Sequence, residues 1–566
     1  MNTQISLLTI AVNYHQAGQL REAEKLYREI LASEPGNADA LHLLGVIAYQ
    51  VGKHEPAIEH IKNAIRLRGM DAEMCSNLGA AYQALNQLKE AECCYQNALQ
   101  ERPDHISARY NIGNLYLKQR KLDEAIDCYR RVLQLQPDNI GAINNLGQAL
   151  KGQEDFSGAA NCYEKILQLQ PGNAEVHINL GTVRDAQKRH NEAIACYRHA
   201  IQLRPDLSTG HYNLGNSLKD QGHLSEAIAS YHRSLQLAPD HADSHFALGM
   251  SSLTVGEWVE GWREYEWRWK THFFKVPDFA QDRGWDGSDL HGRTIVIHAE
   301  QGMGDTIQFV RYLPLVRERG GRIVFQCQDR LTSLLNGVIA ADEIVPREQP
   351  LPPSDCAVAL MSLPGIFNTT PENIPAQIPY LHADPERRAR WRNWLDQYPG
   401  RKVGICWRGN PKHPDDARRS VKLTAFAQLA KIDGIQLVSL QTSDGLEELA
   451  EHAESLNILD AAIVADEKGE SFLELAALYS ELDLIVTVDT VTCHLAGALG
   501  VPAWVALAFM ADWRWLQKRE DTPWYPSLRL FRQQRPGEWD PVFSSMSEAL
   551  SNFFESSRNE GGSAVS

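Results

Sequence analysis

Residues 294–309 read TIVIHAEQGMGDTIQF, an apolar run followed by a turn with two glycines and the start of a helical stretch. A strand that ends in a glycine-rich turn and leads into a helix is the usual opening of a nucleotide-binding unit. The usual fingerprint has a third glycine three residues later, whereas here Gly302 and Gly304 are followed by the acid Asp305. The stretch therefore predicts an α/β unit whose first turn is not built to hold a phosphate.

Apolar runs that alternate with helical stretches surround this unit. The first set is TIVIHA, RIVFQC, DEIVP and CAVALMSLP, and the second is KVGICWRG, QLVSLQT, LNILD, LDLIVTVDT and PAWVALAF. Continuous apolar strands with helices between them favour parallel sheets covered on both faces. We expect two Rossmann-like lobes, residues 286–383 and 384–555, with a cleft between them and ligands at the carboxyl ends of the strands. We also expect the last helix, PVFSSMSEALSNFF, to cross back over the first lobe, and residues 556–566 to form a disordered tail.

The amino-terminal half has a 34-residue period. Glycines recur at Gly45, Gly79, Gly113, Gly147, Gly181, Gly215 and Gly249, with alanines on the same period from Ala23 to Ala227. Prolines or a glycine close the units, and tyrosines follow most of the alanines by four residues. This is the tetratricopeptide pattern, in which small residues allow two antiparallel helices to approach closely. The pattern predicts an all-α solenoid over residues 1–275, with seven repeats and a degenerate, tryptophan-rich eighth that caps it.

A second register of the same period lies two residues before the glycines, at Asn77, Asn111, Asn145, Asn179 and Asn213. One interpretation is that asparagine is simply common on the first helix of the repeat. The other is a ladder of amides that lines the concave groove and binds the backbone of an extended peptide. That ladder resembles the one in the O-GlcNAc transferase superhelix, so we expect a protein or peptide partner in the groove.

Composition limits the possible partners. The chain has 566 residues, 43% of them apolar, and a formal net charge of −16. This charge argues against nucleic acid and anionic membranes as partners. An apolar stretch long enough to span a membrane is not expected, and the first residues lack the pattern of a signal peptide, so we expect a cytoplasmic protein. Four of the ten cysteines share one repeat position, which favours small buried thiols over disulfides or a zinc site.

Four longer stretches carry a family resemblance. They are EQGMGDTIQFVRYLP, WRGNPKHPDDARRSVKL, VDTVTCHLAGALGVPAW and DWRWLQKREDTPWYPSLRLFRQ. Together with the repeats, they resemble bacterial tetratricopeptide proteins that carry a heptosyltransferase-like glycosyltransferase domain of the family 9 type. The resemblance implies a GT-B fold and a nucleotide-diphosphate sugar as the donor substrate. It also implies that Asp305 is the catalytic base and that Asp489, Thr490 and His494 bind the donor.

The stretch TVDTVTCHLAGALG follows an apolar strand and opens a helix. Backbone amides at the helix amino terminus attract a diphosphate, and His494 supplies a further donor. Asp489 could accept hydrogen bonds from the backbone amides of this turn, or it could bind a sugar hydroxyl. The alternative is that Asp489 is only the N-cap of the helix.

The loop WRGNPKHPDDARRSVKL follows the first strand of the second lobe and is rich in cationic and small residues. Such a loop is suited to bind an anion, although a solvated surface loop has the same composition. Arg419 and Ser420 match the family best, and Arg418, Lys412 and Asn410 are secondary candidates. Gln441 ends the next strand, where we expect it to face the nucleoside.

No D-x-D motif occurs in the sequence, so we expect no metal and no other cofactor. Helix amides and guanidinium groups would then neutralise the leaving diphosphate. An inverting transfer also needs a base on the acceptor side, and Asp305 lies at a first-lobe strand end, with Glu300 as the alternative. The competing interpretation is that Asp305 only caps a helix. Gly302, Gly304 and Gln308 would form an open acceptor turn, and Asp305 and His494 would face each other across one cleft.

Trp513, Trp515 and Trp524 fit sugar stacking and inter-lobe packing equally well. Three functions stay open at this point. The first is a metal-independent, inverting transferase with a protein acceptor recruited by the repeats. The second is a transferase acting on an envelope glycan or a lipid-linked acceptor. The third is a repeat scaffold whose transferase domain is inactive.

Overall fold

The computed structural model describes residues 7–281, 283–337, 339–375, 377–463 and 470–562. The chain divides into two compact units, residues 1–217 and 218–566. This boundary lies inside a helix of the seventh repeat, so the last repeat helices pack more with the α/β region than with the earlier repeats. The expected domain boundary at residue 275 stays a prediction. No helix among the described residues is long and apolar enough to cross a membrane.

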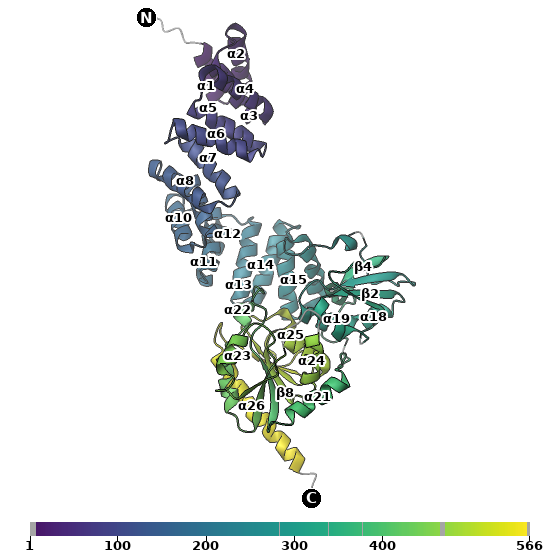
Figure 1. The fold of residues 1–566 in the computed structure, drawn as a ribbon. Coiled ribbons are helices and arrows are strands. Elements are labelled where there is room, and N and C mark those ends of the chain that lie inside the picture. The colour runs from purple at the N-terminus through teal and green to yellow at the C-terminus, as the bar shows by residue number, and fades with distance from the viewer. Residues whose placement is uncertain (1–6, 282, 338, 376, 464–469, 563–566) are drawn as a thin grey trace. The chain divides into compact units, whose positions relative to one another are not determined.

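The repeat region is a succession of antiparallel helix pairs (Figure 1). The seven pairs are α1 (Leu7–Gln16) with α2 (Leu20–Ser33), α3 (Ala38–Gln50) with α4 (His54–Arg68), α5 (Ala72–Ala84) with α6 (Leu88–Glu101), α7 (Ile106–Lys118) with α8 (Leu122–Leu135), α9 (Ile140–Gly152) with α10 (Phe156–Leu169), α11 (Ala174–Ala186) with α12 (His190–Leu203), and α13 (Ser208–Asp220) with α14 (Leu224–Leu237). The predicted seven repeats are confirmed.

The small residues of the repeats lie where the two helices of a pair meet. The alanines Ala23, Ala57, Ala91, Ala125, Ala159, Ala193 and Ala227 are all 0% exposed. A β-carbon at Gly79 would lie 2.7 Å from the ring of Tyr95, and one at Gly181 would lie 2.5 Å from Tyr197. Both distances are shorter than carbon atoms tolerate, so glycine is required at this crossing.

The first helices of the repeats share an N-cap position. The side chains of Asn37, Asp71, His105, Asn139, Asn173 and His241 each accept a hydrogen bond from a backbone amide in the first turn of the helix that follows. These residues are 34 positions apart, apart from one gap at Leu207, and they fix where each repeat begins. All ten cysteines are free thiols, four of them at the repeated position: Cys94 and Cys128 are buried, and Cys162 and Cys196 are half-buried.

An eighth, degenerate pair follows: α15 (Ala242–Val255) and α16 (Trp258–Tyr265), with the 3-10 helix η1 (Glu266–Lys270) after it. Trp258 and Trp262 are 2% and 3% exposed, and both pack against tryptophans of the second lobe. Trp267 stacks on His245, and Trp269 lies against Arg268. The tryptophans of the pair therefore attach the end of the solenoid to the α/β region, as predicted for a cap.

The crossing of α15 and α16 supports a stability prediction. A β-carbon at Gly249 would lie 2.6 Å from the backbone nitrogen of Tyr265. Because that atom belongs to the backbone, Gly249→Ala must separate the two helices, and we expect a loss of about 1–3 kcal/mol in the free energy of unfolding. Gly172→Ala is the matched control, since no atom lies within 4 Å of the position its β-carbon would take. Thermal unfolding followed by circular dichroism compares the two variants, and equal stability would contradict the prediction.

The first lobe is a four-stranded parallel sheet of order β3-β2-β1-β4. Its strands are β1 (Thr294–His298), β2 (Arg322–Cys327), β3 (Glu343–Pro346) and β4 (Cys356–Ala359). Its helices are η2 (Asp278–Ala280), α17 (Met303–Phe309), η3 (Val310–Tyr312), α18 (Leu313–Arg317), α19 (Asp329–Leu335), η4 (Leu360–Ser362) and α20 (Leu363–Ile366). The run CAVALMSLP is a strand only as far as Ala359, because η4 begins at the next residue.

The second lobe is a six-stranded parallel sheet of order β10-β9-β8-β5-β6-β7. Its strands are β5 (Arg401–Cys406), β6 (Ile435–Ser439), β7 (Ile458–Asp460), β8 (Leu484–Val488), β9 (Ala503–Leu507) and β10 (Leu528–Arg532). Its helices are α21 (Pro385–Leu395), α22 (Asp416–Arg419), η5 (Leu423–Lys431), α23 (Leu446–His452), α24 (Glu470–Tyr479), α25 (Val491–Leu499), η6 (Trp513–Trp515) and α26 (Asp540–Gly562). The sequence did not predict β10, since SLRLFRQ has too few apolar residues to stand out.

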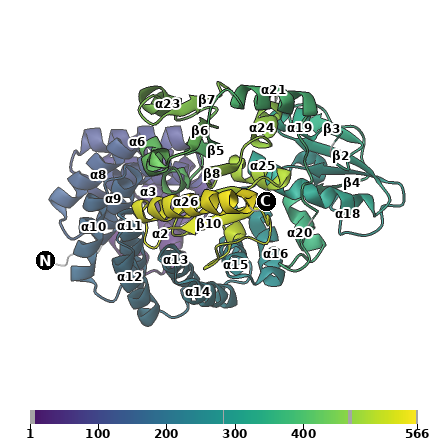
Figure 2. The ribbon, with the colours of Figure 1, turned by 90° about the horizontal axis from the view of Figure 1, so that it is seen from below.

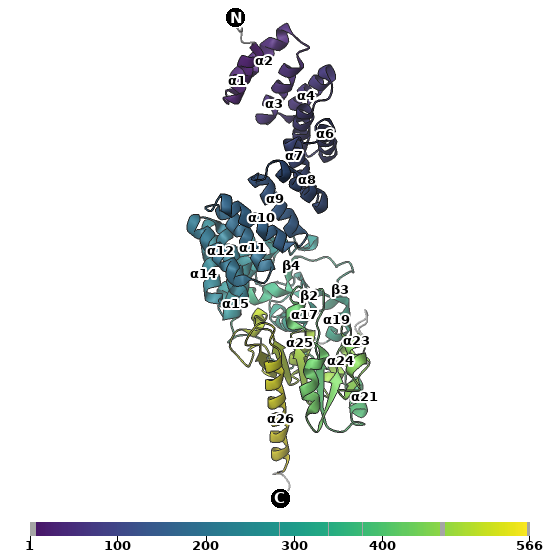
Figure 3. The same cartoon turned by 90° about the vertical axis from the view of Figure 1, so that its left-hand side faces the viewer.

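The last helix corrects two expectations. Val542, Phe543, Met546 and Leu550 of α26 join the core on one face of the second-lobe sheet, and α26 lies beside β10 (Figure 2). The helix therefore covers its own lobe and does not cross back over the first. Its backbone stays helical to Gly562, past residue 556, where we expected disorder (Figure 3). Residues 563–566 of the expected tail lie outside the described residues.

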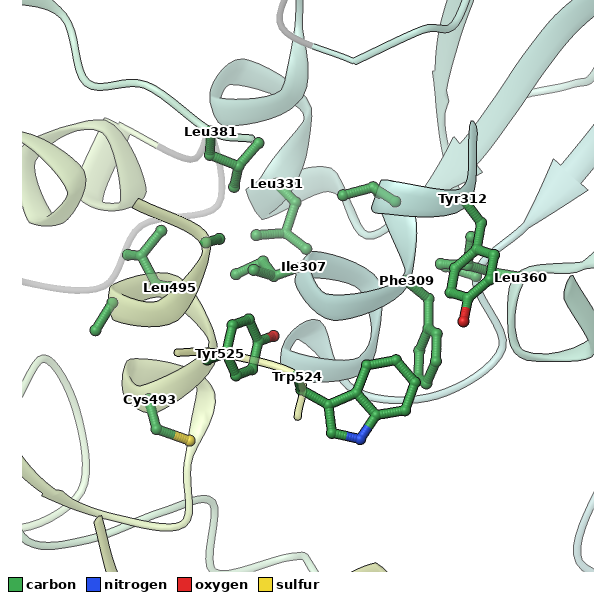
Figure 4. Packing of buried hydrophobic residues seen from close by; sticks show 14 of the residues in the cluster. Ile307, Phe309, Tyr312, Leu331, Leu360, Leu381, Cys493, Leu495, Trp524 and Tyr525 are labelled. Atoms are coloured by element: carbon green, nitrogen blue, oxygen red, sulfur yellow. The ribbon is translucent and has the colours of Figure 1, made fainter. Parts of the chain in front are cut away.

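The two lobes share one hydrophobic core. Ile307 and Phe309 of α17 pack with Cys493 and Leu495 of α25 and with Trp524 (Figure 4). This core includes the cap residues as well, so the cap, the first lobe and one face of the second lobe are joined by continuous packing. The carboxyl ends of the two sheets meet at this junction.

Candidate functional site

The second lobe has its topological switch point between β5 and β8. From β5 the chain continues outward through β6 and β7, whereas β8 is followed by β9 and β10 on the other side. Ligands of such sheets lie where the strand order reverses, at the carboxyl ends. The thiol of Cys406, the last residue of β5, and the Thr490 hydroxyl after β8 are 3.9 Å apart, which marks the crevice. Asp489, Thr490 and His494 are therefore at the position expected for a ligand.

Thr490, rather than Asp489, is the N-cap of α25. The Thr490 hydroxyl accepts a hydrogen bond from the Thr492 amide at 3.3 Å. Asp489 is half-buried beside this cap, and its carboxylate is not needed to begin the helix. Burial, together with the nearby charge of Asp512, raises the pKa of Asp489 to about 6, and Arg419 opposes the shift. An acid with such a pKa at a strand end is typical of a functional site.

His494 is 6% exposed and lies at the contact between the two lobes. Its Nδ1 lies 3.1 Å from the Tyr525 hydroxyl, and its ring stacks on Trp515 with centroids 5.5 Å apart. Burial lowers the pKa of His494 well below its usual value, and Arg514, Arg311 and Arg419 lower it further. The imidazole is therefore neutral near pH 7 and stands in a region of positive potential.

Arg514 connects the two lobes. From the second lobe, its Nε donates to Gln308 Oε1 at 2.7 Å, and its Nη2 donates to Asp305 in the first lobe. Its Nη1 donates to Asp512 at 2.8 Å, and the guanidinium lies over the Trp513 ring. Burial alone would lower the pKa of Arg514, but Asp512 and Asp305 more than offset this and hold the pKa above its usual value.

Both carboxylate oxygens of Asp305 are occupied. Oδ2 accepts from the Gly302 amide at 2.8 Å, which caps α17, and Oδ1 accepts from Arg514. The capping interpretation of Asp305 is therefore confirmed. Only Oδ2 caps the helix, and Oδ1 is directed at Arg514, so capping does not exclude a role as a base. Gln308 is 0% exposed, and its carbonyl oxygen is used by Arg514.

The glycine turn corrects the expectation of open space. Gly302 has a φ of −72°, which any residue adopts. A β-carbon at Gly304 would lie 2.7 Å from His494 Cδ2. Gly304 is therefore needed because α17 packs directly on α25. Asp305, next to Gly304, and His494 both lie near Arg514, in a packed junction rather than across the open cleft that we expected.

Glu300 lies at the switch point of the first lobe, between β1 and β4. Its Oε1 accepts from Arg268 Nη2 at 2.8 Å, and its Oε2 lies 3.4 Å from the Met361 amide. Arg268 comes from η1, is 0% exposed, and also donates to Ser362 at 2.8 Å. Arg268 of the cap thus occupies the space beside Glu300 at this switch point.

The predicted anion-binding residues of the loop after β5 differ in their exposure and in their partners. Arg419 is 19% exposed, lies 3.6 Å from Asp416, and acts electrostatically on Asp489. Ser420 accepts from the Gly409 amide at 3.0 Å and donates to Asp416 at 2.9 Å, so it shapes the loop. Arg418 is 49% exposed and lies 3.8 Å from both Asp220 and Asp415. Only Arg419 of the two arginines reaches the crevice.

Three further candidates have local roles. Asn410 is exposed, and its side chain accepts from the exposed Lys412. Gln441 is 7% exposed, its Oε1 lies 3.3 Å from the amides of Trp407 and Arg408, and its Nε2 donates to the Arg408 carbonyl. The Gln441 amide therefore holds the loop after β5, which does not match the expectation that it faces a nucleoside.

Trp513, Trp515 and Trp524 are at most 1% exposed. Trp524 stacks on Trp258 of the cap, and Trp513 packs edge-on against Trp262. Their faces are used in packing, which favours the packing interpretation over sugar stacking.

Asp489, Cys493 and His494 bring three possible metal-ligand atoms within 4.8 Å of one another. These residue types bind zinc in other proteins. However, three guanidinium groups act on His494, and burial raises the pKa of the Cys493 thiol well above its usual value. The thiol also donates to the Thr490 carbonyl at 2.8 Å. The electrostatics of this cluster suit an anion better than a cation.

Arg514, Asp512, Arg311 and Tyr525 were missed by the sequence reasoning. Arg311 is 5% exposed, donates to the Trp524 carbonyl at 2.9 Å, and lies over the rings of Tyr380 and Tyr525. For Arg514, the sequence signal is an arginine between two tryptophans, in the stretch DWRW. An arginine flanked by aromatic residues that is buried needs an acid partner, which can lie elsewhere in the chain.

The predicted asparagine ladder lies on the first helices of successive repeats, with all five side chains half-buried. Some of its amides bond to other side chains of the repeats rather than standing free. Asn145 donates to Asn114 at 2.8 Å and to Tyr110 at 3.1 Å, and Asn179 donates to Asn144 at 3.3 Å. The groove role of the asparagines stays a prediction.

Comparison with known proteins identifies the repeats. Models described as tetratricopeptide repeat match residues 106–139, 140–173 and 208–241, and a TPR repeat model matches 186–222. A model of anaphase-promoting complex, cyclosome, subunit 3 matches residues 16–98.

Among curated proteins, Protein FlbA of Caulobacter vibrioides is 30% identical over 322 residues, 53% of this chain and 54% of FlbA. The UDP-N-acetylglucosamine--peptide N-acetylglucosaminyltransferase of Caenorhabditis elegans is 34% identical over 82 residues, 14% of this chain and 7% of that protein. This chain thus spans about half the length of FlbA and far less of the transferase.

Among solved structures, the C-terminal part of a TPR repeat-containing protein from Cytophaga hutchinsonii has a TM-score of 0.37 at 16% identity, and the match covers 43% of this chain and 99% of that one. YrrB, described as a TPR protein with an unusual peptide-binding site, has a TM-score of 0.30 at 22% identity, covering 34% and 98%. The helical repeats of this chain are tetratricopeptide repeats, a protein-interaction scaffold, and they precede a region of two parallel sheets.

Proposed function

We propose that this chain is a metal-independent glycosyltransferase of the GT-B type that uses a nucleotide-diphosphate sugar. The observation that carries the proposal is the convergence of Arg419, Arg311 and Arg514 on His494, beside the first turn of α25. Helix amides and guanidinium groups together form a site for a diphosphate. The protein carries a net charge of −16, so this positive region is local.

The same cluster suits an inverting transfer. An acceptor hydroxyl oxygen attacks the anomeric carbon, the bond from that carbon to the diphosphate breaks, and the nucleoside diphosphate leaves with the electron pair. Asp305 takes the hydroxyl proton, and Arg419 with the α25 amides stabilises the leaving charge. Because Arg514 pairs with Asp305 before donor binds, the diphosphate would compete for Arg514 and release Asp305 as a base.

The acceptor in this proposal is a protein that the repeats recruit. Tetratricopeptide arrays form extended concave surfaces that bind peptides and proteins. The match to the peptide-modifying transferase of Caenorhabditis elegans is consistent with this but spans only 14% of the chain. A glycan or lipid-linked acceptor would leave the repeats free for assembly with other proteins.

A second candidate is a scaffold with an inactive transferase domain. It is favoured by one observation, that both oxygens of Asp305 are hydrogen-bonded inside a packed junction. Donor binding separates the two candidates, because an inactive domain that has lost its ligand would not bind sugar nucleotides.

Arg419→Ala tests the proposed donor site. With any sugar nucleotide that binds the wild-type chain, we expect the variant to bind about 1.5–3 kcal/mol more weakly, as for a lost charged hydrogen bond. Arg418→Ala is the matched control. Arg418 is the adjacent residue, but its guanidinium is 49% exposed and faces Asp415 and Asp220. Isothermal titration measures both affinities. Equal effects of the two substitutions would mean that the diphosphate does not contact Arg419.

The pKa of Asp489 gives a pH prediction. Burial raises this pKa to about 6, so the carboxyl becomes neutral as pH falls through that value and stops repelling an anion. The diphosphate of a sugar nucleotide does not titrate in this range, so we expect donor affinity to rise between about pH 7.5 and 5.5. Titrations at several pH values measure the effect. Asp489→Asn should bind with little pH dependence, and a wild-type affinity that is flat with pH would contradict the prediction.

A further inference from the structure

A cavity of about 1370 Å³ lies beside β10, on the side of the second lobe away from β7. Its wall includes the first turn of α14, Thr254 of α15, Trp504 of β9, segments 509–511 and 516–520, β10 with the residues after it, and one side of α26. The volume exceeds the roughly 300–1,000 Å³ of most small-molecule sites. The cavity is therefore large enough for several residues of an extended chain.

β10 is the edge strand of its sheet, and the cavity runs along it. Gln533, just after β10, donates its amide inward to the Leu507 carbonyl at 3.0 Å. By strand alternation, the backbone amides of Arg532 and Gln534 point to the outer edge. The amide of Leu530, earlier on the same edge, already donates to the Glu520 carbonyl at 2.7 Å. The carboxyl end of β10 is thus the part that can accept another strand.

Two polar side chains in this wall keep unused hydrogen-bonding atoms. Gln533 is 3% exposed, and its Oε1 lies 3.1 Å from the Phe509 amide and 3.2 Å from the Gly537 amide. Within the described part of the chain, its Nε2 has no hydrogen-bond partner, and neither has Arg532 Nε. Both atoms are themselves buried, so they make this part of the wall polar but are not contact points for a ligand in the cavity.

One part of the wall is aromatic, among polar and charged residues such as Lys518 and Glu548. Trp504 packs against Phe531 and Phe553 with ring centroids 5.1 Å and 5.8 Å apart, and all three residues line the cavity. Apolar surface beside an open strand edge is the combination used where extended peptides add a strand to a sheet.

The cavity adjoins the candidate transfer site through one short segment. Ala511 and Leu516 line the cavity, and between them Asp512, Arg514 and Trp515 contact the cluster around His494. Arg532 holds this segment from the cavity side by donating to the carbonyls of Trp515 and Leu516, each at 3.1 Å. Leu516 has a φ of +53°, a conformation that an unsupported leucine rarely adopts.

The first lobe offers no equivalent entrance at its switch point. Arg268 of the cap fills the crevice between β1 and β4, where it is 0% exposed and paired with Glu300. An acceptor that entered there would have to displace this buried ion pair.

We propose that the cavity between α14, α26 and the open edge of β10 is the docking site for an extended peptide segment of the acceptor, recognised mainly through its backbone. The acceptor role rests on the proposed glycosyltransferase function. The segment pairs with the carboxyl end of β10, lays aliphatic side chains against Phe531 and Trp504, and leads past residues 511–516 to the transfer site.

The probe is a fluorescein-labelled peptide of alternating threonine and valine, about ten residues long, which favours an extended conformation. Its counterpart replaces every valine by proline and so lacks half of the backbone donors. Anisotropy on the full chain should show binding of the first peptide and at least about tenfold weaker binding of the second. Equal affinities would overturn recognition through the backbone.

Ser545→Trp places a large side chain in the cavity wall, and Ser544→Trp, the adjacent exposed serine outside the wall, is the matched control. We expect Ser545→Trp to weaken binding of the threonine–valine peptide at least about tenfold, and Ser544→Trp to leave it within about twofold. A photo-crosslinking version of the peptide should label residues 222–226 and 504–553. Unchanged affinity in Ser545→Trp, or labels confined to residues 1–217, would overturn the proposal.

Titration of the wild-type chain with sugar nucleotides distinguishes a failure of the docking proposal from a failure of the proposed glycosyltransferase function. If a sugar nucleotide binds and Ser545→Trp has no effect on the peptide, only the docking proposal fails. If no sugar nucleotide binds, the acceptor role fails with the proposed function, even where Ser545→Trp releases the peptide.

Discussion

Asp305→Asn is expected to lower the rate of sugar transfer by about 10²–10⁴-fold, the usual contribution of a general base. The asparagine side chain has nearly the same shape and still accepts from the Gly302 amide, so α17 keeps its cap. Its amide nitrogen then faces Arg514, so that hydrogen bond is lost, while Arg514 keeps its pairing with Asp512. Donor affinity should therefore not fall below that of wild type, because the diphosphate site is in the other lobe and the donor no longer competes with a carboxylate for Arg514.

Asp384→Asn is the matched control for this substitution. Asp384 is also an aspartate that caps a helix, accepting from the Arg387 amide at 2.8 Å, but it lies outside the cluster. Its replacement should leave both transfer and donor binding unchanged. If Asp305→Asn weakened donor binding as much as it slowed transfer, Asp305 would be a structural residue and not the base.

Arg268→Met is expected to lower the free energy of unfolding by about 3–5 kcal/mol, as for a buried ion pair that loses one partner. Arg268 is 0% exposed and pairs with Glu300 at 2.8 Å and Glu266 at 2.6 Å. Burial raises the pKa of Glu300, and Arg268 opposes that rise. Without Arg268, Glu300 is left buried and ionised, or must bind a proton.

If the unpaired charge on Glu300 causes the loss of stability, two further results are expected for Arg268→Met. The loss should shrink as pH falls, because protonation removes the unpaired charge on Glu300. The double variant Arg268→Met/Glu300→Gln should be more stable than Arg268→Met alone, for the same reason. Arg263→Met is the control: Arg263 also pairs with acids of the cap but is 65% exposed, and should cost about 1 kcal/mol or less. Chemical denaturation measures all three, and equal losses for Arg268→Met and Arg263→Met would contradict the account.

The repeats could be predicted almost completely because their packing is periodic. Each close crossing needs glycine or alanine at a fixed spacing, so contacts between neighbouring helices appear in the sequence as a repeat. The lobes were predicted less fully. Strand β10, with Arg529 and Arg532 among its five residues, is an edge strand and does not need the apolar run of a central one. The packing of α26 on its own lobe depends on that strand and was missed with it.

The candidate site shows the same limit. Asp489, Thr490 and His494 could be placed because a parallel strand and the helix after it define a crevice locally. Arg514 meets Asp305 across 209 positions, and no local pattern signals an ion pair of that separation. The packed contact of Gly304 with His494 was likewise outside sequence reasoning, since an open turn and a crowded one both favour glycine.

The central claim is that the crevice between β5 and β8 binds a sugar nucleotide. The most direct measurement is isothermal titration of the full-length chain with ADP-, UDP-, GDP- and dTDP-sugars. We expect saturable binding of at least one of them with one site per chain. Absence of binding across the whole panel would contradict the claim and leave the tetratricopeptide scaffold as the function of the protein.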